Sequence, residues 1–324
     1  MNWHARWFVS MLYLIRSVAS KYSWRFLRPL LFTLAVLGLG GIGTLVLYWK
    51  SGETRFGRTD DFSAWIAVVA FFFMLVTTVA ISTWSSFRRL TAEAGLANII
   101  LSFFIYAIVF TVAVVAPIWL TGSLAIPVYL FHRRVMALVV VVFLVAGDCF
   151  CGLIMLGTVL RERGHFAEEE SMSGREAIQE LLTARSDLRR LLWGSAALIT
   201  GVVFVVAGLR NALNSYANSA VTTVPAISVT GLLLYGAFFA VLLALLSVPT
   251  YLAWQSQAQG LRDRLYPIPF HGRPSREWYE DRSNLEHMLQ MEIGTGQRFA
   301  AALGILAPIA VGIISVFIPV IRGS

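Results

Sequence analysis

The hydrophobic positions of this chain fall into seven long blocks separated by polar segments. The blocks cover residues 30–48, 62–83, 96–120, 135–160, 191–209, 224–248 and 299–320. Each is close to the roughly 20 residues that an α-helix needs to cross about 30 Å of hydrocarbon. Because a backbone inside lipid must satisfy its own hydrogen bonds, blocks of this length favour helices over the shorter strands of a barrel. The pattern therefore predicts an all-α, polytopic helical membrane protein with seven transmembrane helices.

Composition and charge add an orientation to this prediction. The chain is 57% hydrophobic and 14% charged, which is far too apolar for a water-soluble domain. Of its 26 Lys and Arg residues, 19 precede the first block or lie between blocks 2 and 3, 4 and 5, or 6 and 7. The positive-inside rule then predicts a cytoplasmic N-terminus and an external C-terminus. Lysine occurs only at Lys21 and Lys50, and the other basic residues are arginines. This excess of Arg over Lys is typical of GC-rich bacterial genomes and favours a bacterial inner membrane.

Three polar segments are long enough to form cytosolic amphipathic helices, each before an outward-going span. The organisation that follows is an interfacial segment 1–29, spans 1–4 within 30–160, a cytosolic helix within 161–190, spans 5–6 within 191–248, a cytosolic helix within 249–298, and span 7 with the C-terminus in 299–324. Ser173 and Glu176 have the spacing of a capping box, which predicts a helix continuous with span 5. A third helix is predicted to begin at Ser275 and to place Leu285, Met288, Leu289 and Ile293 on one face.

The residue types inside the blocks exclude most membrane-bound chemistry. Neither lysine and no histidine lies in a block, which argues against a retinal Schiff base, bis-His haem or a buried zinc site. The P-loop, His-Glu-x-x-His and Gly-x-Ser-x-Gly patterns do not occur in the sequence. We therefore expect a non-enzymatic protein with no cofactor and no metal.

Asp148 is the only Asp, Glu, Lys, Arg or His inside any block. An ionisable group at membrane depth marks a candidate functional site. An intramembrane aspartyl protease needs two aspartates, so that activity is excluded. Two interpretations stay open: Asp148 links helices through hydrogen bonds, or it lines an ion or proton path. The partners considered for a helix-linking role are Thr77, Thr78, Ser82, Tyr106 and Tyr235.

Three weaker candidates accompany Asp148. Gly304, Pro308 and Gly312 form a stripe in block 7 that predicts close helix packing or a hinge. Arg273 and Arg276 flank the start of a predicted helix and could contact an anion or a lipid headgroup. Cys149 and Cys151 point to different sides of a helix and are not expected to pair.

The function that these features favour is an oligomeric channel or membrane effector regulated through its cytosolic helices. The alternatives are a solute transporter and a membrane scaffold or assembly subunit that docks a soluble cytosolic partner. The expected partners are the bilayer, anionic lipid headgroups, and further copies of the chain or other subunits, with no nucleic acid.

Overall fold

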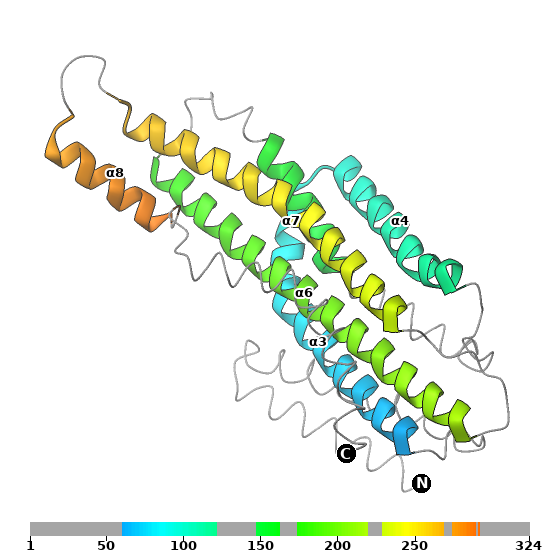
Figure 1. Ribbon diagram of the computed structural model, residues 1–324. Helices are drawn as coiled ribbons and strands as arrows, with labels where there is room; N and C mark the ends of the chain where they lie inside the picture. The colour runs from blue at the N-terminus through cyan, green and yellow to red at the C-terminus, as the bar shows by residue number, and fades with distance from the viewer. Residues whose placement is uncertain are drawn as a thin grey trace, which may run out of the picture.

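The computed structural model describes residues 60–121, 147–162, 174–219, 229–268, 274–289 and 291. These residues form α3 (Asp60–Glu93), α4 (Leu96–Thr121), α6 (Gly174–Ser219), α7 (Val229–Leu265), α8 (Arg276–Met288) and a helical segment at 147–162 (Figure 1). The described part of the chain is all-α, as predicted. Three stretches, Asp60–Glu93, Gly174–Ser215 and Gly236–Leu265, are helices long and apolar enough to cross a membrane. The first and seventh hydrophobic blocks lie outside the described residues.

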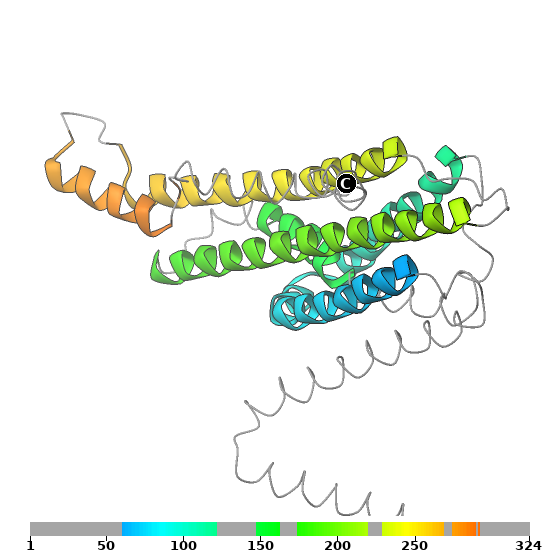
Figure 2. The ribbon, with the colours of Figure 1, turned by 60° about the horizontal axis from the view of Figure 1, so that its bottom comes forward.

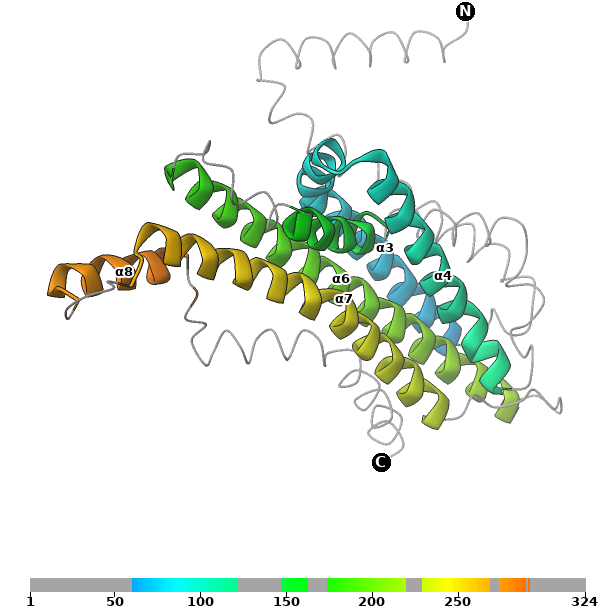
Figure 3. The same cartoon turned by 90° about the horizontal axis from the view of Figure 1, so that it is seen from above.

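The helical segment 147–162, called the central segment below, is buried along almost its whole length. It packs against α3, α4, α6 and α7, and it lies among them when the bundle is viewed from above (Figure 3). Two glycines bring it close to its neighbours, because a Cβ on Gly152 would lie 2.8 Å from Leu191 of α6. A Cβ on Gly157 would lie 2.8 Å from the Thr250 hydroxyl of α7. The helix that carries Asp148 therefore forms the core of the bundle.

An antiparallel seam joins α3 to α6, and the two helices run side by side in Figures 1 and 2. Glycines of α6 recur every seven residues along it, and each receives a larger side chain from α3. The pairs are Gly194 with Val79, Gly201 with Phe72 and Gly208 with Trp65. At the tightest pair, a Cβ on Gly201 would lie only 2.5 Å from the Phe72 ring. Small residues at this spacing let two helices approach closely, which is how helices associate where water does not drive them together.

At one end, α6 and α7 continue beyond the bundle and are joined by α8. The three-helix extension consists of residues 174–190 of α6, residues 249–265 of α7, and α8 (Figure 1). Its centre is Trp254, which is fully buried and donates its indole N–H to the Leu181 carbonyl at 3.0 Å. The Arg185 guanidinium lies 5.0 Å from the centre of the Trp254 ring. As predicted, α6 runs from the extension into the fifth block as one helix, and it begins at Gly174, next to the expected cap.

The start of α8 also agrees with the sequence. Ser275 is its N-cap and accepts a hydrogen bond from the Trp278 backbone N–H at 3.1 Å. Leu285 and Leu289 are buried in the hydrophobic core, whereas Met288 is 55% exposed. The 3.6-residue period puts position 288 at the edge of the apolar face, where a contact depends on the neighbouring helix.

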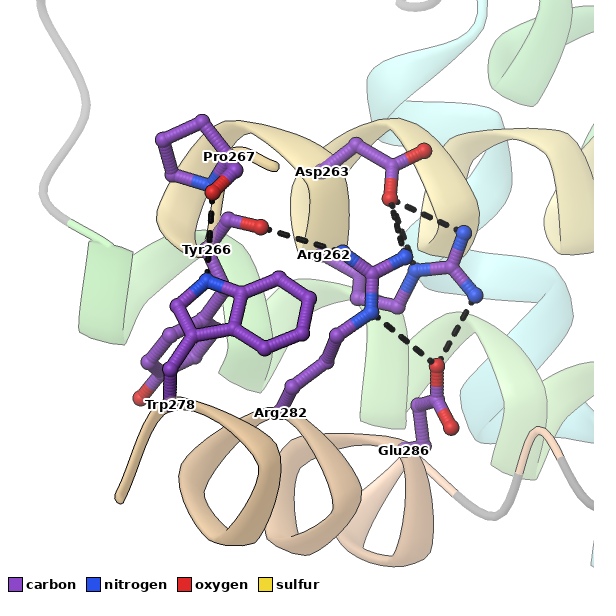
Figure 4. Close-up of polar contacts among 7 residues, drawn as sticks. All are labelled: Arg262, Asp263, Tyr266, Pro267, Trp278, Arg282 and Glu286. Atoms are coloured by element: carbon purple, nitrogen blue, oxygen red, sulfur yellow. Dashed lines mark hydrogen bonds and ion pairs between the residues drawn. The ribbon is translucent and has the colours of Figure 1, made fainter. Parts of the chain in front are cut away.

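An ion network fastens α8 to the end of α7 (Figure 4). Arg262 donates to Glu286 at 2.8 Å and to Asp263 at 2.9 Å. Arg282 of α8 donates to Asp263 at 2.8 Å. The hydrogen bond from Arg262 lowers the pKa of the Asp263 carboxyl below its ordinary value, with a further contribution from Arg282. The two helices are therefore crosslinked in both directions, with a cation and an anion on each.

An aromatic residue, Trp278 of α8, also joins α8 to the end of α7 (Figure 4). The Trp278 indole N–H donates to the Pro267 carbonyl at 3.1 Å, and the Arg282 guanidinium lies 5.1 Å from the Trp278 ring centre. Arg282 also donates to the Tyr266 carbonyl at 3.0 Å. These bonds satisfy carbonyls at the end of α7 that have no partner within the helix.

Candidate functional site

Asp148 lies near the start of the central segment and faces α3. It is 7% exposed, and the Thr83 hydroxyl of α3 donates to its Oδ2 at 2.8 Å. The Thr83 hydroxyl also lies 2.8 Å from the Val79 carbonyl, so it is held between its own helix and the carboxyl. The Gly194 backbone of α6 packs against Thr83, Val79 and the Cys149 thiol. Three helical elements therefore meet at this carboxyl.

The second oxygen of Asp148 is in a different position. Within the described residues, Asp148 Oδ1 is buried and has no hydrogen-bond partner. A buried polar atom without a partner costs about 1–3 kcal/mol. Burial of this carboxyl is therefore unfavourable at Oδ1, whereas the hydrogen bond from Thr83 satisfies Oδ2.

The five partners considered from the sequence are not the donor that the structure shows. Thr77, Thr78 and Ser82 each bond to a carbonyl of their own helix, α3. Tyr106 packs against Gly147 and stacks on the Phe150 ring with centroids 5.7 Å apart. The Tyr235 side chain lies outside the described residues. The actual donor, Thr83, is the last residue of its predicted span and follows Ser82 on the helix, so its side chain faces a different direction.

The two cysteines bind different neighbours, as their spacing predicts. The Cys149 thiol lies 3.7 Å from the Thr83 hydroxyl, and the Cys151 thiol donates to the Ser102 carbonyl of α4 at 3.8 Å. Both are free and fully buried. They act as small packing groups on opposite sides of the central segment.

A second buried carboxylate, Asp187 of α6, contacts α3 about one turn beyond Thr83. The Asp187 side chain of α6 accepts a hydrogen bond from the Ser86 hydroxyl at 2.7 Å and pairs with the Arg89 guanidinium. Arg89 is also 3.6 Å from Glu93. Thr83, Ser86 and Arg89 follow one another at three-residue intervals on α3. The polar residues of α3 thus form one line that binds Asp148 and then Asp187.

Sequence reasoning missed the role of Asp187 because it placed this residue on a cytosolic amphipathic helix and considered buried carboxylates only inside the hydrophobic blocks. The signal was present as a Ser and an Arg three residues apart at the end of a hydrophobic block. A buried carboxylate generally requires such partners. That signal indicates a need for a partner on another helix, but it does not identify the residue.

The other sequence candidates are only partly described. Gly304, Pro308, Gly312 and Arg273 lie outside the described residues. Arg276 is the first residue of α8, is exposed, and pairs with Glu280 at 2.7 Å. The contact of Arg276 with a lipid headgroup stays a prediction. A headgroup would have to compete with the Glu280 carboxylate for this side chain.

Within the described ranges, no cluster of three His, Cys, Asp or Glu side chains could hold a metal ion. The Thr83–Asp148 contact can join helices or exchange a proton along a hydrogen bond. It lies behind Val79 and Gly194, which line a surface groove between α3 and α6. Of the two interpretations of Asp148, the geometry fits helix linking better, because the bond joins two elements of the core.

The fold and this site define the class of the protein: an all-α chain with several helices long and apolar enough to cross a membrane. No family model, no curated protein and no solved structure matches the chain.

Proposed function

We propose that this chain is a non-enzymatic, seven-span membrane protein of the bacterial inner membrane that acts as a channel or membrane effector. Its three-helix extension lies in the cytoplasm and regulates the membrane bundle. The N-terminus is cytoplasmic and the C-terminus external, as the distribution of basic residues predicts.

The observation that carries the proposal is the continuity of α6. This helix of 46 residues contacts the buried Trp254 in the extension and the central segment in the bundle. Leu191 packs on Gly152, and Gly194 packs on the Cys149 thiol next to Asp148. A packed helix moves as a rigid unit, so a shift in the extension would be transmitted to the Asp148 site.

Ion flux through the purified protein in liposomes tests this proposal. Wild-type protein is expected to release an entrapped ion, and Trp254→Ala in the extension is expected to change the rate. Gly260→Ala, on the exposed face of the same helix, is the matched control and should leave the rate unchanged. Vesicles that stay sealed with every protein, although circular dichroism shows each one folded, would contradict the channel form.

A scaffold is the second candidate, because the extension carries large apolar side chains in contact with solvent. Tyr279 and Met288 of α8 and Ile268 beyond α7 are exposed. Exposed apolar groups on a polar surface are typical of protein contacts. A soluble partner recovered in equal amounts with wild type, but lost with Tyr279→Ser and Met288→Ser together, would favour a scaffold. The solute transporter stays a prediction, and saturable uptake would support it.

A further inference from the structure

An apolar groove of about 590 Å³ lies on the outer face of the α3–α6 seam. Its lining consists of Ala, Val, Leu, Phe, Trp, Thr and Gly residues, with no charged side chain. Phe71, Ala197, Gly201 and Phe204 are among its lining residues. A groove of this composition at membrane depth suits a hydrocarbon chain.

A second hollow of about 430 Å³ adjoins the first and has the opposite character. It is lined by Ser82, Ser186, Arg189 and Arg190, while Trp193 lines both hollows. The lining of the α3–α6 face therefore changes from apolar to cationic at Trp193.

The two arginines of this hollow are available to an anion. Asp187, their nearest carboxylate in the sequence, is already bound by Ser86 and Arg89. In the part of the chain that the structure describes, neither Arg189 nor Arg190 forms an ion pair with a carboxylate, and Arg190 donates only to the Ser85 hydroxyl at 3.3 Å. Both side chains are exposed.

Tryptophans place this hollow at the level of a membrane interface. Trp84 of α3 is 59% exposed and Trp193 of α6 is 47% exposed, each at the polar end of its apolar stretch. Exposed tryptophans are enriched at the level of lipid headgroups. A phosphate bound by the arginines would thus lie at its natural depth, with the apolar groove reaching toward the membrane centre.

We propose that the α3–α6 face binds one anionic phospholipid, with its phosphate at Arg189 and Arg190 and an acyl chain in the groove beside Gly201. The charge of the arginines and the continuity of the two hollows commit the site to a lipid rather than to a free anion. Guanidinium groups bind phosphate oxygens through short, charge-assisted hydrogen bonds. This inference does not depend on the proposed function.

Native mass spectrometry of the full chain in neutral detergent tests the site, with added phosphatidylglycerol as the probe. Wild type should retain one lipid per chain more strongly than it retains phosphatidylcholine. Arg189→Gln with Arg190→Gln should weaken retention about a hundredfold, since each of the two charged hydrogen bonds contributes roughly a factor of ten. The charge-matched control is Arg175→Gln with Arg264→Gln, at exposed positions of the extension, and it should retain the lipid.

A second pair of variants tests the groove separately. Ala197→Phe adds a ring inside it and should reduce retention while leaving both arginines in place. Val241→Phe adds the same ring to an exposed position of α7 and should have no effect.

Several results would overturn the proposal. Equal retention of phosphatidylcholine would remove the role of charge, and equal loss in the charge-matched control would show nonspecific attraction. Displacement of the lipid by millimolar inorganic phosphate would indicate a free-anion site. A dimer that retains no lipid, and that Ala197→Phe converts to monomer, would assign the face to a second copy of the chain.

Discussion

Gly194 is the position at which one added methyl group should report on the packing around Asp148. A Cβ there would lie 3.0 Å from Val79, 3.1 Å from the Cys149 thiol and 3.2 Å from Thr83. Carbon atoms pack best at about 3.5–4.0 Å, so all three neighbours would have to move. Val and Thr are stiff about χ1, and Thr83 is held by its bond to Asp148. We expect Gly194→Ala to destabilise the bundle through overpacking by about 1–3 kcal/mol.

Gly260→Ala is the control that removes the effect of helix propensity. Gly260 is exposed in α7, and a Cβ there would meet nothing within 4 Å. Replacing Gly by Ala inside a helix gains about 0.5–1 kcal/mol at either position. The difference between the two variants therefore isolates the packing term at Gly194.

Thermal unfolding of both variants in detergent, followed by circular dichroism, measures this difference. Gly194→Ala should unfold roughly 2–12 °C below Gly260→Ala, at about 2–4 °C per kcal/mol. If Gly194→Ala were as stable as Gly260→Ala, the contact of α6 with α3 and the central segment would not exist as described.

Three further predictions concern single bonds. Thr83→Val should destabilise the protein by about 1–3 kcal/mol, because it leaves the Asp148 carboxyl without its donor. Chemical denaturation measures this free energy of unfolding. If the losses of stability in Thr83→Val and Asp148→Asn were additive in the double variant, the two residues would not share a bond. The folded pKa of Asp263 is lowered by Arg262, so its contribution to the α7–α8 contact is present above the ordinary carboxyl pKa and is lost as the pH falls below about 4. Fluorine NMR of 5-fluorotryptophan protein should follow that loss, and Asp263→Asn should reduce the pH dependence, with Glu286 as the remaining carboxylate of the network. Trp254→Phe should cost about 1–3 kcal/mol and release α8 first, which hydrogen exchange would detect; uniform exchange along the chain would argue against this order.

The long helices could be predicted because each depends mainly on its own residues. The block at 62–83 lies inside α3, and the block at 191–209 lies inside α6. The block at 224–248 overlaps α7, which begins at Val229. A helix in lipid satisfies its backbone internally, so length and apolar content are sufficient evidence for it.

The contacts between helices could not be predicted in the same way. The sequence predicts that Asp148 is buried, but the five partners it suggests include Ser82 and not Thr83, since a single sequence does not give the rotation of one helix against another. The glycines of α6 were overlooked because their seven-residue spacing has no meaning until the opposing residues of α3 are known. Packing between helices depends on pairs of positions that are far apart in the chain.

The regular glycine spacing of the α3–α6 seam does not by itself fix the register of the two helices, whereas the contacts of Asp187 do. Because the glycines repeat every seven residues, a slip of seven residues would still place glycines of α6 opposite large side chains of α3. A slip in one direction would place Asp187 opposite Glu93, and a slip in the other would place it opposite Val79. The first register brings two carboxylates together, and the second buries a carboxylate without Arg89. Buried ion pairs contribute little net stability, yet breaking one costs about 3–5 kcal/mol. The ion pair therefore selects one register among several that the glycines alone would permit, and in doing so it holds Gly194 beside Asp148.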